Sequence, residues 1–235
     1  MVPNPSPNST GAILFDLDGT LVDSAPTMTR GLNEMARRRG APPVEIASVR
    51  RWVSLGGEAM LRGAFGMQTD PIGDLDQFRD ILRRQRADPT DLYPGVHAML
   101  TALRKRGYRT AICTNKREEI AVAYVAGLGI AAYFDVIVGG APGRELKPDP
   151  LLAHMALKQL GAQADEAILV GDSEIDADTA IAAGLRFVLV TFGYPHGNID
   201  AIPADARLNS FDALPFLVSS MSAHRCTRQA EGTRG

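Results

Sequence analysis

Two aspartates near the N-terminus give the strongest chemical signal in this sequence. Asp16 and Asp18 are separated by one residue and followed by Gly19. In an extended chain, residues two apart point to the same side, so both carboxylates can address one site. Such a pair implies a shared proton or a bound metal ion, because each carboxylate raises the pKa of the other. One carboxylate can attack a phosphate ester as nucleophile, while the other serves as general acid and then as general base.

Polar residues at later positions could bind the phosphate of such an ester. Thr114 and Asn115 provide a hydroxyl and an amide that can hydrogen-bond phosphate oxygens. They could equally cap a helix that begins near Glu118, and a helix N-terminus itself binds anions. Lys147 lies in the segment Glu-Leu-Lys-Pro-Asp-Pro, where two prolines stiffen the backbone. A lysine held in this way can neutralise a phosphate and the charge that grows during an in-line transfer.

A second acidic segment could complete a metal site. Asp172 follows a glycine, and Asp176 comes four residues later, in the first turn of an expected helix. Asp172 and Asp16 suit Mg²⁺, which prefers a few oxygen ligands, and Asp176 could brace either Lys147 or the metal ligands. These acids could instead complement a helix N-terminus, just as Asp16 and Asp18 could form an exposed Asp-Gly turn. Four acids that meet without a cation would be costly, so together they favour a metal site.

The elements that position these residues can be inferred from short apolar runs. Runs without period-two alternation are typical of strands covered on both faces, and helical stretches that end at glycines separate most of them. The sequence therefore predicts an α/β fold with a Rossmann-like parallel sheet, whose strand ends bring the polar residues together. The predicted strands are Ala12–Phe15, Thr110–Cys113, Val136–Val138, Ile168–Val170 and Phe187–Thr191. The predicted helices of this core are Val96–Arg106, Glu118–Ala126, Pro150–Leu160 and one that ends at Ala183.

The segment between the first two predicted strands is too long for a single crossover helix, which needs only about ten to fifteen residues. It holds no convincing strand, and its helical patterns cover Pro26–Arg39, Val44–Val53, Glu58–Phe65 and Leu75–Arg86. We therefore predict a small α-helical cap domain at residues 25–89, inserted into a core domain of residues 11–24 and 90–218. Residues 1–10 and 219–235 are predicted to be disordered, because they are polar and lack an apolar pattern.

Composition excludes several classes of protein. The 235 residues include 25 basic and 27 acidic side chains, a net charge of −2, so a general nucleic-acid binder is not expected. Cys113 and Cys226 are too few for a disulfide framework or a zinc cluster, which fits a reducing compartment. The uncharged run Ile120–Phe134 is too short for a membrane span, and Met1–Thr10 does not resemble a secretory signal. We expect a cytoplasmic protein without a membrane or nucleic-acid partner, and the oligomeric state leaves no signal in the sequence.

The order of these chemical parts resembles the haloacid dehalogenase superfamily of phosphatases. The resemblance extends from Gly11 to Leu217 and rests on Asp-x-Asp at positions 16–18, on Thr114, on Lys147 and on the acidic segment that begins Gly-Asp-Ser. The strings Asp-Gly-Thr-Leu-Val-Asp-Ser, Thr-Asn-Lys, Lys-Pro-Asp-Pro and Gly-Asp-Ser, with the helical insert, look most like the phosphoglycolate phosphatase branch.

Two positions depart from that branch. Members often have Trp-Val-Gly-x-Gly where this chain has Trp-Val-Ser-Leu-Gly-Gly at positions 52–57. That loop faces the substrate in capped relatives, so Leu55 could make the pocket more apolar. Arg117 stands where proline is common, on a predicted helix start.

The resemblance implies a role for each acidic residue. Asp16 would be the nucleophile that forms an aspartyl-phosphate. Asp18 would protonate the leaving alcohol and then activate the water that cleaves the intermediate. Mg²⁺ would bind the Asp16 carboxylate, the backbone carbonyl of Asp18 and Asp172, with Asp176 in support.

The resemblance also implies how the substrate is held. Thr114 and Lys147 would hold the transferring phosphoryl group, assisted by Asn115. The substrate would be a small phosphorylated metabolite, with phosphoglycolate as the leading candidate. A phosphomutase or pyrophosphatase of the same fold is the alternative, whereas Asp18 disfavours a dehalogenase. A signalling module that carries a lasting aspartyl-phosphate is the non-enzyme alternative, and the inserted cap disfavours it.

Overall fold

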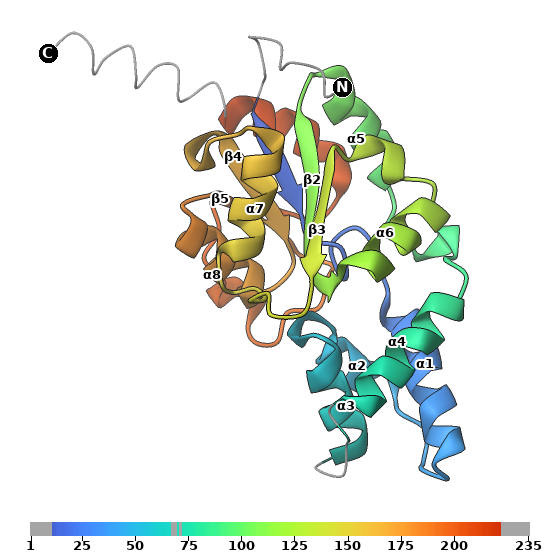
Figure 1. Ribbon diagram of the computed structural model, residues 1–235. Helices are drawn as coiled ribbons and strands as arrows, with labels where there is room; N and C mark the ends of the chain where they lie inside the picture. The colour runs from blue at the N-terminus through green and yellow to red at the C-terminus, as the bar shows by residue number, and fades with distance from the viewer. Residues whose placement is uncertain (1–10, 67–69, 71, 222–235) are drawn as a thin grey trace, which may run out of the picture.

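A sheet domain with helices on both faces joins a smaller group of helices that lies beyond one end of the sheet (Figure 1). The structure, a computed structural model, describes residues 11–66, 70 and 72–221. The ends predicted to be disordered lie outside these ranges, except that residues 219–221 belong to a helix spanning 214–221. Within the described ranges, no helix has the length and apolarity needed to cross a membrane.

Six parallel strands form the sheet: β1 Ala12–Phe15, β2 Arg109–Arg117, β3 Val136–Gly140, β4 Ala167–Gly171, β5 Arg186–Val190 and β6 Ala206–Leu208. Their order across the sheet is β3-β2-β1-β4-β5-β6. β1 lies inside the sheet, where its first residue, Ala12, pairs with Arg109 of β2 and with Ala167 of β4. The chain fills one side of β1 and then the other, so the carboxyl end of β1 is the switch point at which such sheets bind ligands.

The predicted parallel α/β core is confirmed, and two details of its strands differ from the prediction. β2 extends beyond Cys113 to Arg117, so Thr114 and Asn115 lie in the strand. β6 is missing from the sequence prediction, because its three residues form too short an apolar run.

The sheet is covered by α5 Val96–Lys105, α6 Glu118–Gly127, α7 Leu151–Leu160 and α8 Glu174–Ala183. The helix at residues 214–221 packs in the same layer as α5 and α6, through Leu214 and Val218. Successive side chains of β1 point to opposite faces and divide the core into two apolar layers. Ile13 and Phe15 pack in the layer that contains residues of α5 and α6. Ala12 and Leu14 pack in the layer that contains residues of α7 and α8. Both faces are therefore covered, which explains why the strands show continuous apolarity without alternation.

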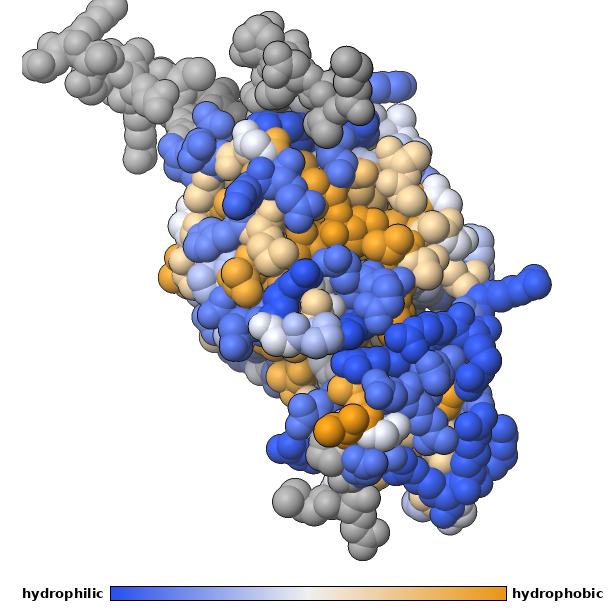
Figure 2. Space-filling model, in the orientation of Figure 1, coloured by the Kyte–Doolittle hydropathy of each residue, from blue (hydrophilic) through white to orange (hydrophobic). Residues whose placement is uncertain are grey.

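Four further helices form the inserted cap: α1 Ala25–Arg38, α2 Ile46–Arg50, α3 Gly57–Phe65 and α4 Gly73–Arg84. Their apolar faces share a third cluster, which includes Met28, Leu32 and Phe78. Hydrophilic residues cover most of the visible surface of the cap (Figure 2). The predicted helical cap is confirmed, while its exact boundaries at residues 25 and 89 stay a prediction.

One predicted cap helix is wrong in its length. The prediction places a single helix at Val44–Val53, but α2 ends at Arg50 and Val53–Leu55 forms a separate 3₁₀ turn. The backbone N–H groups of the two residues after α2 bond three residues back, a tightening that ends the helix. The 3₁₀ turn then places the carbonyl of Ser54 within hydrogen-bond distance of Asn115 in β2.

Candidate active site

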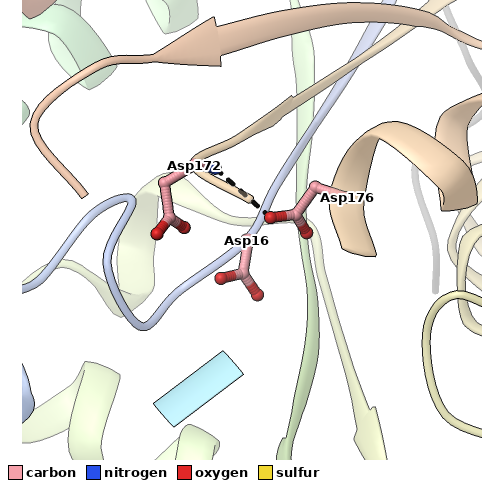
Figure 3. Close-up of side chains that lie close together, drawn as sticks. All are labelled: Asp16, Asp172 and Asp176. Carbon is pink, nitrogen blue, oxygen red and sulfur yellow. Dashed lines mark hydrogen bonds between the residues drawn. The ribbon is translucent and has the colours of Figure 1, made fainter. Parts of the chain in front are cut away.

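Three aspartates from two segments of the chain meet at the carboxyl ends of the central strands (Figure 3). Asp16 directly follows β1, Asp172 directly follows β4, and Asp176 lies in the first turn of α8. The backbone N–H of Asp16 donates to the carbonyl of Val170 at 2.9 Å, which extends the pairing of β1 and β4 to the site. All three side chains are buried, and one carboxylate oxygen of each lies within 4.8 Å of the others. The structure thus brings together the acids that the sequence places at strand ends.

Lys147 joins this cluster from the segment before α7. Its Nζ lies 2.6 Å from Oδ1 of Asp16 and 2.6 Å from Oδ1 of Asp176, and the lysine side chain is only 3% exposed. Burial lowers the pKa of Lys147, but the charges of Asp16 and Asp176 outweigh burial and leave that pKa above its usual value. Lys147 therefore stays cationic, as a group that neutralises phosphate must.

Burial raises the pKa of both candidate metal ligands. The pKa of Asp16 rises from 3.8 to about 7, because burial outweighs the opposing charge of Lys147. Burial also raises the pKa of Asp172 well above its usual value, and the charges of Asp176 and Asp16 add to this effect. With all groups ionised, three carboxylates and one ammonium leave two negative charges in excess. An oxygen donor set with this excess could hold a divalent metal ion, which would neutralise it.

Two neighbouring segments orient the carboxylate of Asp172. The hydroxyl of Thr20 donates to Oδ1 at 2.8 Å, and the backbone N–H of Tyr194 donates to Oδ2 at 2.6 Å. Gly19 has a φ of 91°, and a Cβ at this position would lie 2.3 Å from Oδ2 of Asp172. A glycine is therefore needed after Asp18 for both conformation and space. Sequence reasoning misses Tyr194, because no polar motif marks the loop after β5.

Asp176 has a supporting position, with partners for both of its oxygens. Oδ1 accepts from Lys147. Oδ2 accepts from the backbone N–H groups of Asp172 and Ser173 and from the Ser173 hydroxyl. Ser173 and Asp176 form a capping box at the start of α8. Both interpretations offered by the sequence are therefore compatible, since Asp176 braces Lys147 and also complements a helix N-terminus.

Asp18 lies at the same strand end but contacts a different lysine. Nζ of Lys116 is 2.8 Å from Oδ1 and 2.9 Å from Oδ2 of Asp18, and the lysine and aspartate side chains are 6% and 10% exposed. The sequence prediction gives no role to Lys116. Alternation along the strand gives no clear signal for it, because the pairing of β2 with β3 shifts register between Cys113 and Arg117.

Thr114 and Asn115 lie within β2 and cap no helix. α6 begins at Glu118, and Arg117 before it makes no side-chain capping bond, so the capping alternative is wrong. Thr114 is 1% exposed and borders the site. Asn115 accepts from the backbone N–H of Lys147 at 2.7 Å and donates to the Lys147 carbonyl at 3.0 Å. The Asn115 amide thus holds the backbone of Lys147, and its direct contact with phosphate stays a prediction.

Two cavities adjoin the strand ends beneath the cap. The smaller, of about 10 Å³, is bordered by Asp16, Asp18, Thr114 and Lys147 and by Ser54 of the cap. Oγ of Ser54 is buried and has no hydrogen-bond partner among the described residues. The larger, of about 270 Å³, extends from Asp18 between the cap and the core. Since a volume of about 10 to 15 Å³ holds a single water molecule, the smaller cavity in this arrangement of cap and core is too small for a phosphate.

Comparison with known proteins agrees with this geometry. The family model for haloacid dehalogenase-like hydrolases matches residues 13–190. A phosphoglycolate phosphatase of Rhodobacter capsulatus is 39% identical over 212 residues, which cover 88% of this chain and 96% of the relative. A phosphoglycolate phosphatase of Cupriavidus necator is 37% identical over 214 residues, which cover 88% of this chain and 93% of the relative.

Solved structures extend the similarity to the fold. The crystal structure of a predicted phosphoglycolate phosphatase from Haemophilus somnus has a TM-score of 0.81 and 26% identity, covering 90% of this chain and 99% of its own. CbbY from Rhodobacter sphaeroides, in complex with phosphate, has a TM-score of 0.74 and 27% identity, covering 87% and 96%. Because the family model spans most of the sequence and the relatives match over nearly their whole length, the chain belongs to the haloacid dehalogenase-like hydrolases.

Proposed function

We propose that this protein is a Mg²⁺-dependent phosphatase that hydrolyses a small phosphate monoester through an aspartyl-phosphate on Asp16, with phosphoglycolate as the leading substrate. One observation carries the proposal: Asp16 is paired with Lys147 and lies beside Asp172. A nucleophilic carboxylate, a cation for phosphate and a second metal ligand therefore share one buried site. The names of the relatives and the phosphate-bound structure of CbbY, a structural neighbour, support the choice of a phosphatase.

In the first step, a carboxylate oxygen of Asp16 attacks phosphorus, and the bond from phosphorus to the leaving oxygen breaks. The ammonium of Lys147 and the hydroxyl of Thr114 stabilise negative charge on the other phosphoryl oxygens. Asp18, in its protonated form, gives its proton to the leaving alcohol. A Mg²⁺ ion held by Asp16, Asp172 and the carbonyl of Asp18 would neutralise charge on the carboxylates and the phosphate.

In the second step, water attacks the phosphorus of the aspartyl-phosphate. Asp18, now ionised, takes a proton from this water, and the bond between phosphorus and Asp16 breaks. Inorganic phosphate leaves, Asp16 is regenerated, and Asp18 is again protonated for the next substrate. The contacts of Lys116 with both oxygens of Asp18 fix this carboxylate at the strand end.

The larger cavity favours a small anionic substrate. Its volume of about 270 Å³ lies just below the range of about 300 to 1,000 Å³ that is usual for ligand pockets. Two acids, Asp18 and Glu58, line it, and apolar residues such as Leu55 line other parts. Four cationic side chains line it as well: Arg79, Lys116, Arg117 and Arg144. The lining thus carries more positive than negative side chains, although acids outside it pair with the three arginines. This charge and the names of the relatives support phosphoglycolate, an ester with a second anionic group.

A panel of phosphate esters assayed with Mg²⁺ tests the proposal. The panel includes phosphoglycolate, sugar phosphates, nucleotides and pyrophosphate, and each ester is also assayed with a chelator in excess. We expect release of phosphate that requires Mg²⁺, with phosphoglycolate among the preferred substrates. If another ester is strongly preferred, the proposed substrate is wrong, but the proposed phosphatase activity is still supported. Activity that survives the chelator would contradict the mechanism.

A further inference from the structure

Lys116 occupies a position that the proposed mechanism uses only in part. It borders the small cavity beside Asp16 and the cavity of about 270 Å³ between the cap and the core. It also lines a third cavity of about 400 Å³, which lies between α1, α4 and α6. Among the described residues, Lys116 alone lines all three cavities. Lys116 therefore borders both the cavity beside Asp16 and the larger cavity in which the rest of a substrate could lie.

The contacts of Lys116 leave capacity for a ligand. An ammonium group has three N–H donors. Two of them are accounted for by the oxygens of Asp18, and the ring of Tyr124 lies 5.3 Å from Nζ. One N–H therefore remains for an anionic group in the adjoining cavity.

Simple lengths show which substrate group can reach this ammonium. A general acid must lie within about 3 Å of the leaving oxygen, and Nζ of Lys116 is 2.8 Å from Oδ1 of Asp18. With bond lengths of about 1.2 to 1.5 Å, a carboxylate attached to the carbon next to the leaving oxygen holds its own oxygens about 3 Å from that atom. Such a carboxylate can therefore accept from Lys116 while the leaving oxygen contacts Asp18.

We propose that Lys116 determines substrate specificity by binding a carboxylate on the carbon next to the ester oxygen, as in phosphoglycolate. This inference rests on the proposed function and adds the residue that recognises the leaving group. The class of substrate is a phosphorylated 2-hydroxy acid. Lys116 thereby holds both Asp18 and the leaving group in one arrangement.

Two arginines of the same cavity differ from Lys116, because their charges have partners outside its lining. Arg117 contacts Glu119 at 3.1 Å, and Arg144 contacts Glu118 at 2.5 Å. Neither acid lines the cavity. In contrast, the partner of Lys116 is Asp18, at the point where chemistry occurs.

The test compares phosphoglycolate with ethyl phosphate, which has the same two-carbon length but no carboxylate. In the wild-type protein we expect a clear preference for phosphoglycolate in kcat/KM. In Lys116→Met this preference is expected to fall about 10- to 100-fold, the effect of losing one hydrogen bond between charged groups. Lys116→Arg should restore part of the preference. Arg104→Gln removes an exposed ion pair with Asp135 that lines none of the three cavities, and it should change the preference less than about threefold.

The ratio of the two substrates separates specificity from positioning. If Lys116→Met lowers kcat/KM equally for both esters, Lys116 only positions Asp18 and the inference is wrong. The wild-type protein gives a second test that needs no variant, since the neutral carboxamide of phosphoglycolate should be turned over about as poorly as ethyl phosphate. Equal use of the acid and the carboxamide would overturn the inference. Hydrolysis of none of these esters would instead count against the proposed function itself.

Discussion

The strand ends and the cap both contain ion pairs, but in opposite environments. At the strand ends, the side chain of Lys147 is 3% exposed and those of Asp16 and Asp176 are 7% and 1% exposed. On the cap, Arg62 and Glu58 are 62% and 59% exposed. The same pairing of a carboxylate with a cation is therefore buried in one region and solvated in the other.

Solvation decides what such pairs can do. Exposed pairs contribute about 0 to 1 kcal/mol to stability, because water screens them. Removal of one partner from a buried pair costs about 3 to 5 kcal/mol, because a charge is left without compensation. Burial also raises the pKa of Asp16 and Asp172. The exposed ion pairs of the cap stay in contact with water and do not undergo this desolvation. The visible surface of the cap is mostly hydrophilic (Figure 2), whereas the charged residues at the strand ends form a buried cluster.

The largest effect is expected for Asp16→Asn. The amide cannot attack phosphorus, so kcat should fall by about ten-thousand-fold or more, as is usual when a nucleophile is removed. Steady-state phosphate release from the preferred ester measures this change. Circular dichroism of the variant should match the wild type, and a folded variant with substantial activity would exclude Asp16 as nucleophile.

Lys147→Met should lower both activity and stability. Two buried carboxylates, those of Asp16 and Asp176, would lose the cation that contacts them, so the free energy of unfolding without metal should fall by about 3 to 5 kcal/mol. Urea denaturation in the presence of a chelator measures this loss. An unchanged midpoint of urea denaturation would mean that Lys147 does not compensate the negative charges of Asp16 and Asp176. Added Mg²⁺ should recover part of the stability.

The metal-free protein should lose stability as pH rises from about 4 to about 7. The pKa of Asp16 is 3.8 in the unfolded chain and about 7 in the folded protein, so the folded state binds the proton more tightly in this window. This contribution is fully present below the unfolded pKa and is lost as pH passes through the folded pKa. Denaturation with a chelator at several pH values measures the slope. For Asp16→Asn, the free energy of unfolding should fall less steeply with pH than it does for the wild type. An equal slope would show that other groups cause the pH dependence.

The smallest effect is expected on the cap. Arg62→Gln removes an exposed pair with Glu58 at 2.9 Å and should change the free energy of unfolding by less than about 0.5 kcal/mol. Urea denaturation beside Lys147→Met gives the comparison directly. A loss as large as that of Lys147→Met would show that exposure does not separate the two regions.

The sequence predicts the core well because its strands are buried on both faces. β1 is predicted with its observed bounds, and Asp16 and Asp172 follow as residues at the ends of strands that prove to be neighbours. Pairing across the fold is harder to foresee. Lys116 and Asp18 are 98 residues apart, and no local pattern shows that this lysine meets that aspartate.

The remaining differences between the sequence prediction and the structure also arise from contacts and turns that no local sequence pattern shows. Tyr194 reaches Asp172 through its backbone N–H, a group that every residue except proline has, so its identity gives no signal. Asn115 has the hydrogen-bonding groups expected of a phosphate ligand, but in the structure they bind the backbone of Lys147. The exact end of α2 depends on a tightened turn that hydrophobic periodicity does not show.

The most direct test of the proposed mechanism is to locate the phosphoryl group during turnover. The protein is mixed with phosphoglycolate and Mg²⁺, quenched in acid within the first turnovers, and treated with borohydride, which reduces an aspartyl-phosphate to homoserine. Peptide mass spectrometry then identifies the modified position. We expect homoserine at Asp16, with Asp18 unmodified. Homoserine at Asp18, or no modified aspartate while phosphate is being released, would contradict the proposed mechanism.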